Sequence, residues 1–413
     1  MTPKARALGG PLITPTTITL FAICALMAII LLVRFVFGLG AVTNLNNGYP
    51  WGIWLAYDVA AGTAVACGGY ALALVTYALN RGQYSPIMRP AILASMFGYA
   101  MGGFSVLVDI SRWWNFWHIL WPTYFNLNSV MIEVALCISA YTTILMIEVA
   151  PALVEKAVEW TRTRNADLHR LTLKVQKVLN RVLIVFVALG MTLPTMHQSS
   201  LGTLLIPFGA TMNPLWNTPL LPLLFLITAL CIGYAIVIFE ATLVSDRFSR
   251  PSEAGILGQL AKFMMVTIAV FLAARVIDVA VTGKTHLIFT SGVLGLLFVI
   301  ECLLFGAALY VLSAKERRMT PRGQFIAAVF VLAGGVLYRV DSYLVCYHRP
   351  GWSYFPSVSE MLISFGMIAL EVLGYVLLIK LLPILHQADY GHKHSNPPNT
   401  STCPPAEALG AVE

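Results

Sequence analysis

The chain has 413 residues, of which 58% are hydrophobic and only 11% are charged, and its formal net charge at pH 7 is +7. Its mean hydropathy is +0.78. Because most of the sequence falls into apolar runs of about twenty residues or more, this composition excludes a string of soluble domains. It is typical of a protein that crosses the membrane many times.

The apolar runs predict the membrane helices. A helix needs about 20 apolar residues to cross roughly 30 Å of hydrocarbon, and by this measure we expect ten spans: 16–38, 52–79, 89–111, 127–150, 178–199, 217–243, 258–281, 287–313, 322–346 and 358–382. The first run is too long for a cleavable signal peptide and lacks a small-residue cleavage site, so we expect it to remain as a helix. The sequence therefore predicts an all-α membrane domain over residues 1–385.

Lysine and arginine are unevenly distributed between the two ends of these spans. They cluster before the first span, in the loops that follow the even-numbered spans, and after the last span. The opposite ends of the spans carry only Arg112, Lys284 and Arg349. By the positive-inside rule, both termini are predicted to be cytoplasmic. The net charge then reflects topology rather than nucleic-acid binding.

Tryptophans gather on the predicted outer side, where every one except Trp160 falls. For most of them an ordinary aromatic belt at the lipid headgroups is a sufficient explanation. The stretch SVLVDISRWWNFWHILWP at 105–122 differs, because it places four tryptophans beside Asp109, Arg112 and His118 at one helix end. A belt shared by both interfaces does not explain this concentration.

Two segments are predicted to lie outside the membrane. Residues 151–177 mix acidic and basic side chains and resemble an amphipathic cytoplasmic connection near the membrane surface. The segment 386–413 is rich in Pro, Asn, Ser and Thr, so we expect a disordered cytoplasmic tail.

The sequence offers few ligands for a redox group. A haem held between membrane helices usually needs two facing histidines, but of the eight histidines only His197 falls within a span. The seven cysteines show no CxxC or similar spacing, which argues against an iron–sulfur or zinc site and favours apolar packing. We therefore expect no bound haem, no iron–sulfur cluster and no metal in this chain.

Ionisable residues inside the spans are the main functional candidates, because charge is costly in hydrocarbon. Arg34 is predicted to extend to the outer interface. Arg275 and Asp278, three residues apart on one helical face, predict an ion pair, whereas Arg339 and Asp341 must each find a partner on another helix. The predicted depths place ten residues near the outer end, three in the middle and two near the inner end: Arg34, Asp58, Asp109, Glu133, His197, Arg275, Asp278, Arg339, Asp341 and Glu360; Tyr99, Glu301 and Glu371; and Glu148 and Glu240.

Glu133 and Glu148 share one predicted helix. Fifteen residues separate them, which corresponds to about 60° around the helix and roughly 22 Å along it. Such a stripe is suited to a proton route, although two unrelated carboxylates, each satisfied by a neighbouring helix, fit the spacing too. Asp58 has two interpretations as well, as a first-turn acid favoured by the helix dipole or as a hydrogen-bonding partner of a ligand.

Three stretches resemble a known family. NNGYPWGIWLAYDVAAGTA at 46–64, GYAMGGFSVLVDISRWWNFW at 98–117 and NSVMIEVALC at 128–137 are similar to the NrfD/polysulfide-reductase family of quinone-reactive membrane subunits, and within it to the membrane subunits of [NiFe] hydrogenases. The resemblance implies a haem-free subunit of the bacterial inner membrane. It also implies an extracytoplasmic iron–sulfur protein that passes electrons from the hydrogenase large and small subunits to menaquinone or ubiquinone.

The resemblance places the quinone site on the outer side of the first helix bundle. We expect its residues among Asp58, Tyr99, Asp109, Arg112, His118 and Glu133, with the tryptophans walling the site or docking the partner. A proton route is predicted through Glu133, Glu148, His197 and Glu240. For Tyr99 and His197, ordinary packing or backbone hydrogen bonding stays an open alternative.

Other functions remain compatible with the sequence. The chain can instead be the membrane subunit of a different molybdenum or iron–sulfur oxidoreductase, or an anchor that does not touch quinone. A secondary transporter is a less favoured interpretation, because no internal repeat is evident and charge near the midplane is sparse.

Overall fold

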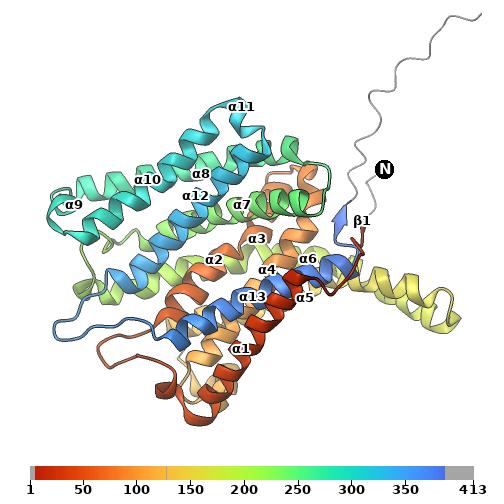
Figure 1. The fold of residues 1–413 in the computed structure, drawn as a ribbon, viewed down its shortest axis with the longest axis horizontal. Coiled ribbons are helices and arrows are strands. Elements are labelled where there is room, and N and C mark those ends of the chain that lie inside the picture. Colours follow the sequence, from red (N-terminus) through yellow and green to blue (C-terminus); the bar gives the residue numbers. More distant parts are fainter. Residues whose placement is uncertain (1–4, 127, 387–413) are drawn as a thin grey trace, which may run out of the picture.

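The computed structural model describes residues 5–126 and 128–386, and most of them lie in helices (Figure 1). Within this part of the chain, ten helical segments are long and apolar enough to cross a membrane, which confirms the predicted all-α class and number of spans. They are Pro15–Phe37, Trp54–Ala78, Gly82–Asp109, Val130–Thr161, Ala166–Thr211, Leu221–Arg247, Ala254–Val281, Val293–Ser313, Pro321–Val345 and Val358–Leu381.

Nine of the spans are built mainly on one α-helix each: α1 (Pro15–Phe37), α4 (Met88–Asp109), α5 (Val130–Thr161), α6 (Ala166–Leu205), α7 (Leu221–Arg247), α8 (Ala254–Val281), α10 (Val293–Ser313), α12 (Pro321–Val340) and α13 (Val358–Leu381). Short helices and 3-10 turns connect or extend them: η1 (Leu39–Ala41), η4 (Gly82–Ile87), η5 (Trp113–Leu120), η6 (Pro122–Tyr124), η7 (Ile206–Thr211), α9 (Leu287–Thr290) and α11 (Lys315–Arg318).

The second span is less regular than the others. It passes through the π-helix η2 (Trp54–Gly62), the short α-helices α2 (Thr63–Val65) and α3 (Gly68–Ala73), and a further π-helix, η3 (Leu74–Ala78). The ninth span also ends in a π-helix, η8 (Asp341–Val345). A π turn disturbs the regular backbone ladder and is frequent at functional sites. The second span is therefore the part of the backbone best suited to offer free carbonyl groups to other side chains.

Side-chain caps fix where several helices begin. Thr14 and Thr17 form a reciprocal capping box at the start of α1, and Ser357 and Glu360 form another at the start of α13. These pairs satisfy backbone N–H groups that have no partner inside the helix. They therefore set the positions at which the first and last spans enter the bundle.

The helices pack in two groups joined through the second span. This span packs with α4 and α6 on one side, and it contacts α7 and α12, which pack with α8 and α10, on the other; α6 and α7 also pack directly against each other. The helices α1 and α13 pack against each other, and α13 lies against α4 (Figure 1). The first and last spans thus form a pair at the edge of the bundle.

Residues 151–177, predicted to be an amphipathic connection between two spans, belong mostly to the helices that form those spans. Helix α5 continues to Thr161 and α6 begins at Ala166, so the two helices form an antiparallel hairpin that extends beyond the rest of the bundle (Figure 1). The Asn165 side chain caps α6 by accepting hydrogen bonds from the backbone N–H groups of Asp167 and Leu168. The predicted span ends at 150 and 178 were too short, because the segment is helical almost throughout and prolongs two spans.

The two ends of the described chain meet at one end of the bundle. The strand β1 (Ala5–Arg6) pairs with β2 (Leu385–His386) in an antiparallel arrangement. Nearby, Arg89 binds both carboxylate oxygens of Glu155 at 2.9 and 2.7 Å, and Arg250 donates to the His386 carbonyl. We call this end the basic side and the end that carries η5 the tryptophan side. The predicted disordered tail lies outside the described residues, apart from His386, which belongs to β2.

Candidate functional site

A buried polar cluster lies where α4, α6 and the second span meet. The Tyr99 hydroxyl is 3.3 Å from Gln198 Nε2, which donates to it, and 3.4 Å from Cys67 Sγ. Thr63 Oγ1 lies 3.0 Å from His197 Nε2 and accepts a hydrogen bond from Gln198 Nε2 at 3.1 Å. We call these five residues the central cluster. It joins two of the predicted residues, Tyr99 and His197, which are far apart in sequence.

Arg339 adds a fixed positive charge to the central cluster. Its side chain is fully buried and donates to Gln198 Oε1 at 2.8 Å and to the Ala60 carbonyl of η2 at 2.6 Å. The other arm of the guanidinium group donates to the Phe225 carbonyl and to Thr228 Oγ1 on α7. Arg339 thus binds residues of three other spans, as predicted from its lack of a partner on its own helix.

The carboxylate stripe of α5 runs beside the central cluster. Glu133 accepts a hydrogen bond from Ser200 of α6 at 2.7 Å. Two turns further along α5, the Tyr141 ring packs edge-on against Tyr99, with centroids 4.5 Å apart. A Cβ atom added at Gly190 of α6 would lie 3.0 Å from Glu148 Oε1, so the missing side chain lets this carboxylate approach α6. Both carboxylates face α6, as the helical spacing predicts.

Asp58 faces away from the central cluster and toward α13. Its Oδ2 atom accepts a hydrogen bond from Ser364 at 2.7 Å, and it lines a cavity of about 780 Å³. Glu240 of α7 and Glu371 of α13 line the same cavity. The predicted proton route is therefore divided: Glu133, Glu148 and His197 lie along α5 and α6, whereas Glu240 belongs to the cavity.

Asp109 lies at the end of α4, next to the buried residue Arg34. Arg34 was predicted to extend to the outer interface, but its side chain is fully buried and donates to the carbonyl groups of Val108 and Ile110, each at 2.6 Å. These carbonyls belong to the last turn of α4 and have no helical partner. The sequence prediction was wrong because it did not account for the neighbouring helix end that Arg34 caps.

Arg112 and His118 lie on the surface of the tryptophan side. Arg112 is exposed, and the His118 ring stacks on Tyr124 with centroids 4.0 Å apart. Around them, η5 and the residue after it expose the large side chains of Trp114, Trp117 and Trp121. The structure does not bring Arg112 or His118 into contact with Asp58, Tyr99 or Glu133. It places them instead on an exposed aromatic surface.

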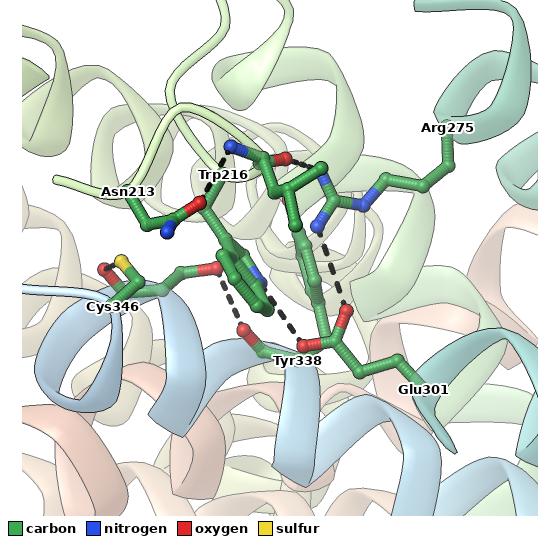
Figure 2. A network of polar contacts seen from close by, with 8 residues as sticks. Asn213, Trp216, Arg275, Glu301, Tyr338 and Cys346 are labelled. Carbon is green, nitrogen blue, oxygen red and sulfur yellow. Dashed lines mark hydrogen bonds and ion pairs between the residues drawn. The ribbon is translucent and has the colours of Figure 1, made fainter. Parts of the chain in front are cut away.

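A second buried polar network occupies the other helix group (Figure 2). Arg275 lies 3.5 Å from Glu301 Oε2 and donates to the Leu215 carbonyl at 2.6 Å, while Trp216 Nε1 donates to Glu301 Oε1 at 3.0 Å. Asp278 instead accepts a hydrogen bond from Thr218. The predicted ion pair between Arg275 and Asp278 was therefore wrong, because a carboxylate on α10 takes the place of the neighbour on the same helix.

Sequence reasoning did not name Thr63, Gln198, Ser364 or Glu371 as site residues. Glu371 and Arg339 could be recognised as ionisable residues inside spans, but their partners depend on how the helices rotate in the bundle. Gln198 and Ser364 are neutral and gave no signal. Only the adjacency of Gln198 to His197 could have drawn attention to it.

The fold and these buried groups define a helical membrane protein with titratable residues beneath an aromatic surface. Residues 41–346 match the family described as Polysulphide reductase, NrfD. The chain therefore belongs to the NrfD family of membrane subunits of oxidoreductase complexes, which confirms the resemblance seen in the sequence.

Several relatives match most or part of the chain in sequence. The chain is 40% identical to the "Probable Ni/Fe-hydrogenase 2 b-type cytochrome subunit" of Escherichia coli over 93% of its own length and 96% of the relative. It is 20% identical to a selenate reductase subunit of Mesobacillus selenatarsenatis over 92% and 96% of the two chains. A shorter match, 28% identical over 40% of this chain and 37% of the relative, is to the "Menaquinone reductase, integral membrane subunit" of Nitratidesulfovibrio vulgaris.

The residues around His197 do not fit a haem, the group that the name of the Escherichia coli relative implies. The His197 ring is fully buried, with Nε2 beside Thr63 and its face near the Tyr99 ring, 5.6 Å between centroids. The other described histidines lie toward helix ends, in loops or in β2, at positions 118, 169, 286, 348 and 386. The described residues therefore offer no facing pair of histidines within the bundle.

Proposed function

We propose that this chain is the haem-free, quinone-reducing membrane subunit of a respiratory hydrogenase complex in the bacterial inner membrane, with both termini cytoplasmic. The observation that carries the proposal is the arrangement on the tryptophan side. There, Asp58, Asp109 and Glu133 lie near the ends of their spans, on the same side of the bundle as the exposed aromatic side chains of η5. The menaquinone reductase and hydrogenase relatives support the choice of substrate and complex.

The exposed aromatic surface is proposed to bind the electron donor. Trp114, Trp117 and Trp121 are 57%, 44% and 60% exposed, and large aromatic side chains are enriched at protein interfaces. An extracytoplasmic iron–sulfur subunit bound there would hold its cluster close to the buried acids. The [NiFe] hydrogenase large and small subunits would supply its electrons.

The chain's own residues are proposed to bind the quinone and supply its protons. Reduction of menaquinone or ubiquinone to quinol takes up two electrons and two protons. Carboxylic acids and a tyrosine hydroxyl within hydrogen-bonding reach of the carbonyl oxygens can donate to them as they gain charge. We assign this role to Asp58, Tyr99, Asp109 and Glu133, and we assign Arg112 and His118 to the rim of the site.

Protons are proposed to reach Glu133 along the seam between α5 and α6. Glu148 lies closest to the basic side on this seam, Tyr141 and Tyr99 lie between, and His197 is hydrogen-bonded within the central cluster. Glu240 does not lie on this seam, because it lines the cavity beside Asp58. If electrons enter from the tryptophan side and protons from the basic side, each turnover moves charge across the membrane.

A related function is favoured by the wider set of relatives. The selenate reductase relative matches nearly the whole chain, so the same fold serves an oxidoreductase of another class. In that alternative the donor complex contains no [NiFe] hydrogenase, and the membrane chemistry stays the same. Co-purification separates the two, because hydrogenase subunits accompany the chain only in the first case.

The haem-free assignment makes a direct spectroscopic prediction. The chain purified from a haem-replete host should show no reduced-minus-oxidised haem b spectrum, because the described part of the bundle offers no facing histidine pair. A haem b-containing subunit purified from the same membranes provides the positive control. A stoichiometric haem b signal from the isolated chain would contradict this part of the proposal.

Charge movement is tested in liposomes that contain the whole complex and quinone. With hydrogen as the donor, we expect wild type to generate a membrane potential, which a voltage-sensitive dye reports. Glu148→Gln should lower the potential formed per quinol, because Glu148 lies at the basic end of the α5–α6 seam. A wild-type complex that reduces quinone without forming a potential takes its protons from the tryptophan side, and the route through Glu148 is then excluded.

A further inference from the structure

A helix that lies outside the residues matched by the family model forms one wall of the cavity beside Asp58. The second span, α4, α7 and α13 supply most of its lining. The family match ends at residue 346, whereas α13 begins at Val358. The cavity is therefore completed by a helix that the family match does not include.

One face of α13 runs along the whole cavity. Ile368, Glu371, Tyr375 and Ile379 line the cavity at helical spacing, and with Ser364, one turn before Ile368, the stripe covers roughly 22 Å. At the tryptophan side this stripe begins with Ser364, which is bonded to Asp58. At the basic side the cavity lining includes polar residues from three helix ends, namely Thr14, Thr16, Thr17, Arg247 and Lys380. The cavity thus connects Asp58 with the basic side.

Two carboxyl groups line the cavity between these ends. Glu371 lies within electrostatic reach of Asp58 on one side and of Glu240 on the other. Within the described part of the chain, neither Glu240 nor Glu371 has a hydrogen-bond partner or an ion pair. A carboxyl group kept from bulk water is costly unless something hydrogen-bonds to it. One water occupies about 30 Å³, so the cavity has the volume for a chain of water molecules, and although most of its lining is apolar, Asp58, Glu240 and Glu371 offer the polar partners that such water needs.

A smaller cavity adjoins this one on the basic side. The two share Ala91, Glu240, Val244 and Tyr375 in their linings, so Glu240 and Tyr375 stand at the junction.

The smaller cavity is also lined by Arg250, Glu253 and His386. Burial raises the pKa of Glu253 above its ordinary value, more than the charge of Arg250 lowers it. The protonated form of Glu253 therefore extends to higher pH than in an exposed glutamate, which suits a group that supplies protons.

Resting on the proposed quinone reduction, we propose that this cavity is a water-filled proton route from the basic side to Asp58 by way of Glu240 and Glu371. In each transfer one carboxyl O–H bond breaks and a water or the next carboxylate gains the proton. Asp58 then gives its proton to the reduced quinone and is reprotonated from Glu371. The electrons come from the iron–sulfur partner and the protons from water on the basic side, so both are balanced.

This route is separate from the seam between α5 and α6. Glu133, Glu148 and His197 do not line the cavity, and Asp58, Glu240 and Glu371 do not lie on the seam. A reduced quinone needs two protons, and two routes that approach the second span from opposite sides can supply one each. Loss of either route alone then limits turnover.

Water access is measured by cysteine labelling of the whole complex in membrane vesicles of both orientations. Val376 lines the cavity, and its neighbour Leu377 does not, so Val376→Cys and Leu377→Cys form a matched pair at the same depth. A charged, membrane-impermeant thiol reagent should label Val376→Cys from the basic side alone and leave Leu377→Cys unlabelled. The complex with its native cysteines gives the baseline. This result does not depend on quinone turnover.

The carboxylate is tested by Glu371→Gln in the same complex. Quinone reduction should fall roughly 100-fold, the usual scale for loss of a proton-transfer group, while reduction of an artificial dye upstream stays unchanged. Glu371→Asp should restore part of the rate, because it keeps a titratable group in the cavity. Dye reduction shows that the variant complex is assembled.

The possible results of these experiments distinguish a failure of this proton route from a failure of the proposed function. If the wild-type complex reduces no quinone, the proposed function fails, and with it the route. If wild type reduces quinone, equal labelling of Val376→Cys and Leu377→Cys overturns the route, as expected for a cavity filled by a lipid chain. Full quinone turnover in Glu371→Gln overturns it as well.

Discussion

Glu133→Gln should abolish hydrogen-dependent quinone reduction while the complex stays assembled and still reduces an artificial dye. Glu133 lies in the first turn of α5, and it accepts a hydrogen bond from Ser200, so Gln preserves the size and the contact but cannot deliver a proton. Loss of a general acid typically costs 10²- to 10⁴-fold in rate, and we expect a fall of about 100-fold or more. Quinol formation is followed spectrophotometrically under hydrogen.

Glu159→Gln provides the matched control for this variant. Glu159 lies on the same helix, but its side chain is 73% exposed and forms an ion pair with Lys156 one turn away. This substitution removes the same charge far from the proposed site, so quinone reduction should keep its wild-type rate. Unchanged quinone turnover in Glu133→Gln would remove Glu133 from the site, whatever the control shows.

Arg339→Met should destabilise the folded bundle more than most single substitutions. The guanidinium group donates to backbone carbonyls of Ala60 and Phe225 and to the Gln198 side chain, and Met leaves these buried acceptors without their donor. Leaving buried polar groups unsatisfied costs about 1–3 kcal/mol each. Removal of a buried charge offsets part of this cost, so we expect a net loss of roughly 3 kcal/mol.

The loss is measured as a fall in melting temperature of the purified complex in detergent, by roughly 5 °C. Arg349→Met removes an exposed arginine from a loop on the tryptophan side, and it should leave the melting temperature unchanged. Both substitutions remove one positive charge, so the comparison separates the effect of losing a buried arginine from the effect of losing a charge. Equal melting temperatures for Arg339→Met and wild type would mean that the central cluster is held by packing alone.

The sequence predicted the spans well because hydropathy reports on them directly. A run such as 16–38 must be apolar along its length whatever its neighbours are, and the structure places α1 at Pro15–Phe37. The junction between the fourth and fifth spans was mispredicted for the opposite reason. Residues 151–177 are polar because the hairpin leaves the apolar part of the bundle, and polarity alone does not distinguish a helix extension from a surface segment.

Partners of buried charges were predicted less well than their depths. Spacing along one helix suggested Asp278 as the partner of Arg275, but the closest carboxylate belongs to Glu301 on another helix. Arg34 likewise binds carbonyl groups of α4. Such contacts depend on the rotation of each helix about its axis and on which helices are neighbours. Neither quantity is contained in the hydropathy of a single span.

For the candidate site, too, the sequence predicted what lies along one helix but not how the helices pack together. Helical spacing put Glu133 and Glu148 on one face, and the structure agrees because both positions belong to one helix. The division of the proton-route residues between the α5–α6 seam and the α13 cavity needed the three-dimensional packing. Glu240 and Glu148 have similar predicted depths, yet Glu148 approaches α6 whereas Glu240 lines the α13 cavity.

The pairing of the first and last spans has a consequence for biosynthesis. Helix α1 packs against α13, and β1 pairs with β2, although more than 300 residues of chain separate them. At about 5–20 residues per second, a ribosome needs roughly 20–70 s after completing α1 to produce its partner. During that interval α1 must be shielded by lipid or by the insertion machinery. A chain released early, before α13, would therefore leave α1 without its binding surface and be a ready target for membrane proteases.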